Sequence, residues 1–333
     1  MKLIFDINGG DNKSEIIKGA IEASNEFDTD IILVGREDFI KENLQKLDYN
    51  KDKVEIVDAK ENIENNEDPA FALRRKKDSS IVIAMTLLKE KKGDALISAG
   101  STGALLAGGL FIVGRIKGIK RAVLPTSIPG MKSNTMVIDS GANMDTSPEL
   151  LLEFATLGEV FLKEYYKIDS PRVGLLNVGS EEGKGNSLYK ETYKVLKDSN
   201  INFVGNIEAR DIMNNEVDLL VCDGFDGNIL LKSIEGVVDF AVKNVFHSLE
   251  KSDLDDESKA LFSKFLMTKF KNLDAKEVGG TILLGIDGNI IKAHGNSDER
   301  AIKNAAKYAI SIVESNVVKK IKDKVEGKWK KEF

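Results

Sequence analysis

Five short loops rich in glycine each follow a run of aliphatic residues, and they hold the residues best suited to chemistry. They are Asp6–Asp11, Ser98–Gly103, Asp139–Asn143, Asn177–Asn186 and Asp223–Asn228. Glycine lets backbone N–H groups approach an anion closely, and a helix that follows adds the positive end of its dipole. One such loop could serve only chain reversal. Five on one edge of a sheet predict a site for phosphate or a phosphorylated ligand.

The loops do not match the standard nucleotide-binding motifs. Gly179–Lys184 resembles a P-loop, but three residues separate its glycines instead of four. Gly185 also stands where that motif needs Ser or Thr. No Gly-x-Gly-x-x-Gly opens a predicted helix, which disfavours a dinucleotide. A small anion remains the expected guest.

The elements that must position these loops are short buried strands alternating with amphipathic helices. The predicted strands are Lys2–Asp6, Ile31–Val34, Val54–Val57, Ala95–Ser98, Met136–Asp139, Val173–Asn177, Phe203–Asn206 and Leu219–Cys222. Helical segments such as Ser14–Glu26 and Asn186–Asp198 lie between them. This alternation predicts a doubly wound, mostly parallel α/β sheet, in which ligands bind at the carboxyl ends of the strands. Asp287-Gly288 predicts a hairpin between Thr281–Ile286 and Asn289–Ala293.

A helical hairpin is predicted within residues 236–278, inside a single domain that spans residues 1–333 because no linker composition interrupts it. Its helices are Gly236–Glu250 and Glu257–Asn272, joined by the acidic loop Ser252–Asp256. The second helix has an apolar face with lysines among it: Leu261, Phe262, Phe265, Leu266 and Phe270, with Lys259, Lys264, Lys269 and Lys271. Two interpretations stay open: packing on the core or a partner subunit, and contact of residues 250–272 with a membrane surface.

Composition excludes several classes of function. The 333 residues carry a formal net charge of −6, which disfavours nucleic acid as a partner. The chain has no apolar run long enough to span a bilayer. Its single cysteine, Cys222, rules out an intramolecular disulfide and fits a reducing cytoplasm. One cysteine and two histidines leave little for a zinc site, so we expect neither metal nor cofactor.

Nine segments together resemble the phosphate acyltransferase family of bacterial phospholipid synthesis (the PlsX type). They are Asp6–Asp11, Asp68–Ser80, Ser98–Leu105, Gly108–Phe111, Asp139–Asn143, Val173–Asn186, Asn202–Asp211, Val221–Leu231 and Lys292–Asn304. The resemblance covers nearly the whole chain. It implies a fold like phosphotransacetylase and isopropylmalate dehydrogenase, a homodimer with a helical arm, and transfer of a long-chain acyl group from acyl carrier protein to inorganic phosphate. The chain departs from the family at Ile7-Asn8, Ser101 and Asp226, where Ala-Met, Asn and Thr are usual.

The resemblance implies three catalytic residues, and each also has a structural interpretation. Lys184, between two glycines, would bring its ammonium to phosphate or to the tetrahedral oxyanion; otherwise it is a surface lysine. Asn228 would donate an amide N–H to the carbonyl oxygen; otherwise it is a helix N-cap. His294 would bind phosphate or protonate the leaving thiolate; otherwise it is structural. Cys222 and His247 are interpreted as structural.

For phosphate binding we expect Gly100, Ser101, Thr102 and Gly103, with Asn143 nearby. Acyl carrier protein is acidic, so candidate docking residues are basic: Arg74-Arg75-Lys76-Lys77, Lys89, Lys91 and Lys92. Such charge runs are also typical of solvated helix faces. Two alternative functions stay open: a phosphotransacetylase-like enzyme that uses acyl-coenzyme A, and a non-catalytic protein that binds a fatty-acyl or phosphoryl ligand.

Overall fold

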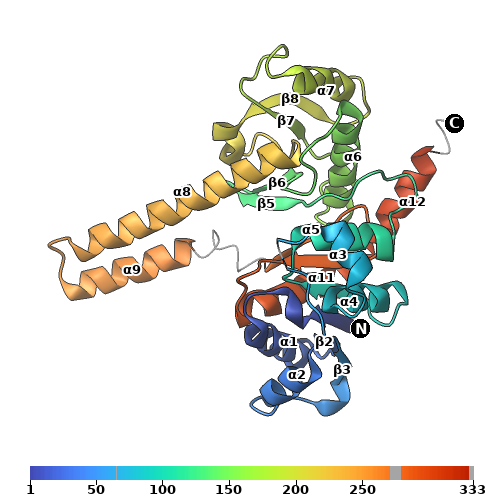
Figure 1. Cartoon of the computed structure of the whole chain (residues 1–333). Helices are drawn as coiled ribbons and strands as arrows, with labels where there is room; N and C mark the ends of the chain where they lie inside the picture. The colour runs from blue at the N-terminus through green and yellow to red at the C-terminus, as the bar shows by residue number, and fades with distance from the viewer. Residues whose placement is uncertain (65, 271–278, 330–333) are drawn as a thin grey trace.

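The computed structural model describes the chain except residues 65, 271–278 and 330–333, and its described strands form two sheets (Figure 1). The first sheet has the order β10-β11-β4-β1-β2-β3, and all neighbours are parallel except β10 and β11. Its strands are β1 (Lys2–Asp6), β2 (Asp30–Gly35), β3 (Val54–Asp58), β4 (Ala95–Ser98), β10 (Gly280–Ile282) and β11 (Ile290–Ala293).

The second sheet has the order β5-β6-β9-β7-β8, and only its β5–β6 pair is antiparallel. Its strands are β5 (Thr126–Pro129), β6 (Asn134–Ile138), β7 (Val173–Asn177), β8 (Phe203–Glu208) and β9 (Leu219–Val221). One buried cluster contains residues of both halves, among them Phe5 of β1 and Leu175 of β7. A common core therefore joins the two sheets.

Helices cover both faces of the first sheet because successive side chains of a strand point to opposite faces. Leu3 and Phe5 belong to the same buried cluster as α1 (Lys13–Phe27) and α11 (Glu299–Ser315), whereas Ile4 belongs to the cluster of α4 (Ser80–Lys89). The other α-helices that the structure describes outside the arm are α2 (Glu37–Leu44), α3 (Pro69–Arg75), α5 (Thr102–Gly108), α6 (Pro148–Glu164), α7 (Ser187–Lys197) and α12 (Val317–Trp329).

Local capping explains where several helices begin. Ser147 accepts a hydrogen bond from Leu150 N before α6, Asn186 from Tyr189 N before α7, and Asp298 from Ala301 N before α11. These side chains satisfy N–H groups that the first helical turn leaves without an intrahelical acceptor. The caps therefore fix where α6, α7 and α11 begin after the loops that follow β6, β7 and β11.

The α/β class and all eight predicted strands are confirmed, with ends that shift by one or two residues. The antiparallel pairing of the predicted hairpin is confirmed by β10 and β11, but its first strand ends at Ile282 and not at Ile286, because Leu284 and Ile286 bridge to Val123 and Arg115 instead. The expectation that five glycine loops share one edge was wrong. Asp6–Asp11 and Ser98–Gly103 follow strands of the first sheet, and the other three follow strands of the second. Strand order depends on long-range pairing, which local patterns do not specify.

An arm projects from the second sheet as two antiparallel helices, α8 (Gly224–Glu250) and α9 (Asp256–Phe270) (Figure 1). The first of these begins at Gly224, not at the expected Gly236, because Asp223 caps it by accepting from Asp226 N at 2.7 Å. At 27 residues it is about 40 Å long. The expected end of α9 at Asn272 lies outside the described residues. In the part of the chain that is described, no helix is long and apolar enough to cross a membrane.

Candidate active site

The loops after β1 and β4 lie in contact around a buried carboxyl group. Asp6 ends β1 and accepts hydrogen bonds from Ser80 Oγ at 2.5 Å and Ser98 Oγ at 2.7 Å. Burial raises the pKa of Asp6, while these hydroxyls act in the opposite direction. A Cβ added to Gly9 would lie 2.9 Å from Gly100 N, so the two loops approach more closely than another residue would allow.

The loop after β11 joins the same end of the first sheet. Asp11 N donates a hydrogen bond to Gly295 O at 2.9 Å, which places Gly295 against the first loop. His294, just before it, is exposed, and its carbonyl accepts from Ser297 N at 3.1 Å. The structure thus brings His294 to the sheet end that carries Gly100–Gly103.

In the expected phosphate loop, Gly100–Gly103, one N–H group bonds within the loop and others could bind an anion. Gly100 N donates to Ser98 Oγ at 3.1 Å, so this N–H group supports the loop itself. Helix α5 begins at Thr102 after Ser101, and first-turn N–H groups have no intrahelical acceptor. Gly103 packs against α3, because a Cβ there would lie 2.7 Å from Pro69 Cγ. Ser101, Thr102 and Gly103 are therefore the residues whose N–H groups could face an anion.

The loop after β6 is organised by a second buried carboxyl group. Asp139 accepts from the backbone N–H groups of Leu124 (3.0 Å), Ala142 (3.0 Å) and Asn143 (2.6 Å). The amide nitrogen of Asn143 donates to the same carboxylate at 2.9 Å and to Ala122 O at 2.8 Å. Burial raises the pKa of Asp139, and these donors oppose the rise. The structure does not place Asn143 on the sheet that carries Gly100–Gly103, and its amide nitrogen holds its own loop.

Asn228 is the fifth residue of α8, so the N-cap interpretation was wrong; Asp223 is the cap. The backbone of Gly141 passes over Asn228 with φ +133°, and a Cβ there would lie 3.5 Å from Asn228 Cγ. Gly224 N donates to Asn143 O at 2.7 Å. These contacts hold the first turn of α8 against the Asp139–Asn143 loop and leave the Asn228 amide partly exposed beside it.

Lys184 lies on the neighbouring loop, between β7 and α7. Asn177 Nδ2 donates to Lys184 O at 3.2 Å, and Gly185 turns the chain with φ +89°. The Lys184 side chain is half-exposed, and its ammonium nitrogen lies 3.7 Å from Glu181 Oε1. Tyr189 of α7 donates its hydroxyl to Asp226 of α8 at 2.5 Å. Lys184, on the loop after β7, and Asn228, near the start of α8 after β9, therefore follow paired strands.

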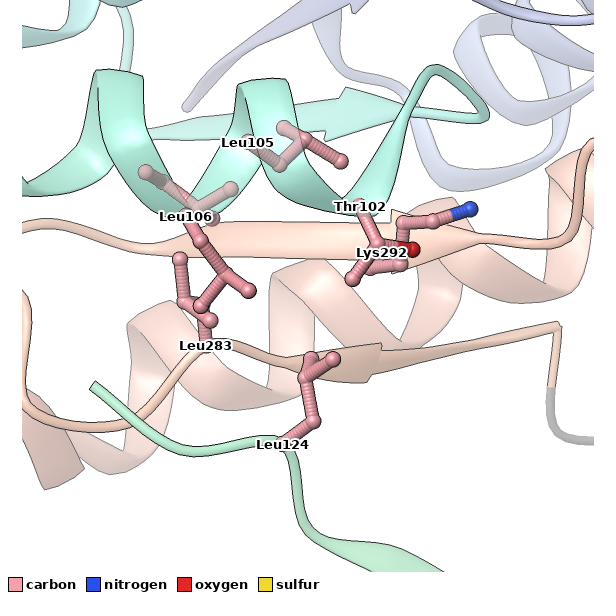
Figure 2. Close-up of a pocket in the computed structure, with 7 residues that line it drawn as sticks. Thr102, Leu105, Leu106, Leu124, Leu283 and Lys292 are labelled. Atoms are coloured by element: carbon pink, nitrogen blue, oxygen red, sulfur yellow. The ribbon is translucent and has the colours of Figure 1, made fainter. Parts of the chain in front are cut away.

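The two groups of loops are connected through Leu124, which precedes β5. Its N–H group donates to Asp139 of the second sheet, and its side chain lines a narrow pocket of the first. Figure 2 shows this pocket, which is lined by Thr102, Leu105, Leu106, Leu124, Leu283, Ile290 and Lys292. Ala142 of the Asp139 loop packs against the hydrophobic cluster that contains Leu105 and Leu124 of this pocket. The carboxyl ends of the two sheets thus meet at one place.

A family model described as fatty acid synthesis protein matches residues 1–320. A phosphate acyltransferase of Clostridium novyi (strain NT) is 47% identical over 334 residues, covering 98% of this chain and 99% of that protein. One from Clostridioides difficile (strain 630) is 46% identical over 327 residues, covering 96% and 95%. The chain belongs to the phosphate acyltransferase family. It is therefore an acyltransferase enzyme.

Solved structures of phosphotransacetylases share the fold of this phosphate acyltransferase family member. One from Streptococcus pyogenes has a TM-score of 0.61 at 16% identity and covers 94% of each chain. A branched-chain phosphotransacylase from Enterococcus faecalis V583 has a TM-score of 0.59 at 12% identity, covering 94% of this chain and 99% of that one. The expected likeness to phosphotransacetylase is confirmed at the level of fold.

The expected basic docking residues lie at different ends of the first sheet. Asp94 N donates to Lys2 O at 2.7 Å, so the segment Lys89–Lys92 adjoins the amino ends of β1 and β4, away from the loops. Arg74 and Arg75 are exposed on α3, whose Pro69 contacts Gly103. The Arg75 guanidinium lies 5.3 Å over the exposed ring of Phe71. Lys76 is engaged internally, by Glu67 Oε1 at 2.6 Å and Asn62 O at 2.7 Å.

The positions of Cys222 and His247 fit the structural interpretation of both residues. Cys222 is fully buried, its Sγ is 3.5 Å from Asp139 O, and burial together with the Asp139 charge raises the pKa of the thiol well above its usual value. A thiol in this state is a poor nucleophile. His247 lies near the distal end of α8, on the arm.

Sequence reasoning missed Lys292, which the structure places at the site. It lies in β11, opposite Ser98 of β4, in a segment that reads Ile290-Ile291-Lys292-Ala293. Burial lowers the pKa of Lys292 to about 8, while Asp11 and Asp6 act to raise it. A lysine inside an otherwise apolar strand was the available signal, because such a residue is rarely buried without a partner.

Proposed function

We propose that this acyltransferase moves a long-chain acyl group from acyl carrier protein to inorganic phosphate, giving acyl phosphate for phospholipid synthesis. Family membership supports the reaction class. The observation that carries the proposal for the site is the packing of Asn228 of α8 against Gly141, together with the Tyr189–Asp226 hydrogen bond that joins α8 to the helix after the Lys184 loop. An ammonium group and an amide thus come from the segments that follow the paired strands β7 and β9, and the described residues hold no cluster of metal ligands.

In the proposed reaction an oxygen of phosphate attacks the thioester carbonyl carbon. The new C–O bond forms, the C–S bond breaks, and the leaving thiolate becomes a thiol by gaining a proton that balances the one hydrogen phosphate loses. Phosphate already carries negative charge near neutral pH, so the protein must mainly position it and stabilise charge on the carbonyl oxygen. We assign the N–H groups of Ser101, Thr102 and Gly103 to phosphate, and Lys184 and Asn228 to the carbonyl oxygen.

His294 and Asn143 take different parts in this proposal. The exposed His294 ring, at the same sheet end as the phosphate loop, would protonate the leaving thiolate or contact phosphate. Asn143 was expected among the phosphate ligands, but its amide nitrogen is engaged by Asp139 and Ala122. We therefore assign Asn143 to holding the loop that lies over Asn228.

For the acyl carrier protein we propose a docking surface formed by Phe71, Arg74 and Arg75 on α3. It offers positive charge and an exposed aromatic ring beside the phosphate loop, which suits an acidic protein that must bring its thioester there.

For the arm we propose contact with a second copy in a homodimer and with the membrane surface. Support comes from apolar side chains that are more than half exposed: Val237, Phe240, Leu261 and Met267.

The test is incubation of the purified protein with palmitoyl-carrier protein and phosphate, with acyl phosphate trapped by hydroxylamine. Lys184→Ala should reduce trapped product by about 100-fold, as loss of an oxyanion contact does in other acyl transfers. Lys190→Ala, an exposed lysine on the following helix, is the matched control. Unchanged product in Lys184→Ala would refute the role of that lysine.

The phosphotransacetylase fold gives a second candidate, an enzyme that takes acyl-coenzyme A as donor. Parallel assays with palmitoyl-carrier protein and palmitoyl-coenzyme A separate the two, because the favoured donor has the higher kcat/KM. Absence of phosphate-dependent thiol release from either donor would instead indicate a protein that binds its ligand without turnover.

A further inference from the structure

Three residues form a row across the carboxyl end of the first sheet. The strand register aligns Asp6 of β1 with Ser98 of β4, and Ser98 with Lys292 of β11. Ser98 Oγ donates to Asp6, so the row is joined on one side by a hydrogen bond of 2.7 Å. Side chains at aligned positions of parallel strands point to the same face, which places the lysine beside this pair.

Lys292 also borders the phosphate loop. It lines the same pocket as Thr102, the first residue of α5, and in Figure 2 its ammonium group points away from the leucines of that pocket. The ammonium donates a hydrogen bond to the adjacent Ala293 O. A lysine can donate three hydrogen bonds, so two donors remain for other acceptors.

The charges around Lys292 make a cation necessary if phosphate binds there. Asp6 and Asp11 are the carboxyl groups whose charge acts on it, from β1 and the loop that follows. The neighbouring strand β4 contributes Ser98, α5 contributes Thr102, and Asp298 of α11 is engaged as a helix cap. Without Lys292, a phosphate dianion at Ser101–Gly103 would be repelled by the carboxylates of Asp6 and Asp11.

We propose that Lys292 is a further catalytic residue, the cationic ligand that holds the phosphate nucleophile against the N–H groups of Ser101, Thr102 and Gly103. This inference rests on the proposed function and gives two lysines different roles. Lys292 on the first sheet binds the attacking phosphate, and Lys184 on the second acts at the carbonyl oxygen. The reaction's bonds are unchanged, because Lys292 neither gains nor loses a proton in the step.

The first test measures KM for phosphate at a saturating concentration of acyl donor. Lys292→Met should raise this KM by about 10- to 100-fold, the effect of losing a hydrogen bond to a charged group, and leave the KM for acyl donor within about threefold. Lys292→Arg, which keeps the charge, should recover most of the loss. Lys307→Met, an exposed lysine of α11, is the control.

The results separate this inference from the proposed function. If the wild type shows no phosphate-dependent thiol release, the proposed function fails. If the wild type is active and Lys292→Met keeps the wild-type KM for phosphate, only the Lys292 assignment is overturned. A loss of kcat without a selective change in phosphate KM also overturns it, since a purely structural lysine would give that result.

A second test does not depend on the methionine variant folding. In the wild type, kcat/KM for phosphate should fall as pH rises through about 8, where Lys292 loses its proton. Arginine stays protonated at every accessible pH, so Lys292→Arg should move this fall to higher pH. An unchanged descending limb in Lys292→Arg would show that another group titrates there and would overturn the assignment.

Discussion

The hydroxyl of Tyr189 donates a 2.5 Å hydrogen bond to a carboxylate oxygen of Asp226, joining the helix after the Lys184 loop to the helix that carries Asn228. The bond therefore connects the segments that carry two proposed catalytic groups. Burial and the Asp226 carboxylate both raise the pKa of Tyr189, so the hydroxyl stays protonated and remains the donor.

Tyr189→Phe should lower kcat several-fold and the free energy of unfolding by about 1.5–3 kcal/mol, because the Asp226 carboxylate loses a donor in a partly buried place. Steady-state assays and urea unfolding measure the two effects. Tyr193→Phe on the same helix is the control, since it keeps the ring contact with Phe203 at 5.1 Å. Equal kcat in the two variants would exclude a positioning role for Tyr189.

Gly227→Ala should destabilise the protein by about 1–3 kcal/mol, because the added methyl group would lie 3.0 Å from the Asp139 carbonyl carbon and 2.9 Å from Cys222 Sγ. Gly236→Ala lies further along α8, where nothing stands within 4 Å of the added atom. That variant should gain about 0.5–1 kcal/mol from helix propensity. Thermal or urea unfolding of both variants tests the packing of α8 on the Asp139 loop; a harmless Gly227→Ala would contradict it.

The partly buried Lys292 predicts a dependence of stability on pH. Its pKa is about 8 in the folded protein, against 10.5 when unperturbed, so between these values the unfolded chain binds more protons. The wild type should therefore gain stability as pH rises through this window. Relative to Lys292→Met, the gain from pH 7 to pH 10 should be about 2 kcal/mol. Urea-unfolding curves of both proteins at both pH values measure this gain. If the lysine were solvated, the stability difference between the two proteins would be the same at pH 7 and pH 10.

The arm should mediate association through its exposed apolar residues. Leu261→Asp, at a side chain that is 69% exposed, should weaken either dimer formation or binding to vesicles that contain anionic lipid. Sedimentation velocity measures the first and liposome flotation the second. A charge reversal outside the apolar face, Lys243→Glu on α8, is the control for flotation. Wild-type behaviour of Leu261→Asp in both assays would leave the arm without either role.

The sequence alone determined most of the elements, because their signals are local. Apolar runs located eight strands, Asp287-Gly288 located the β10–β11 hairpin, and Asn186 marked the start of α7. The glycine loops and Lys184 were recognisable for the same reason. Each depends on the backbone preferences of a few adjacent residues, which the chain carries wherever it folds.

Only the tertiary structure decided how these elements combine. It divided the strands between two sheets, since β6 pairs with β9 more than 80 residues away and not with a strand of the first half. It made Asn228 part of a helix and Asn143 a support for Asp139, and it placed Lys292 beside Asp6 and Thr102. These outcomes depend on burial and on pairing between distant segments, and no local pattern contains them.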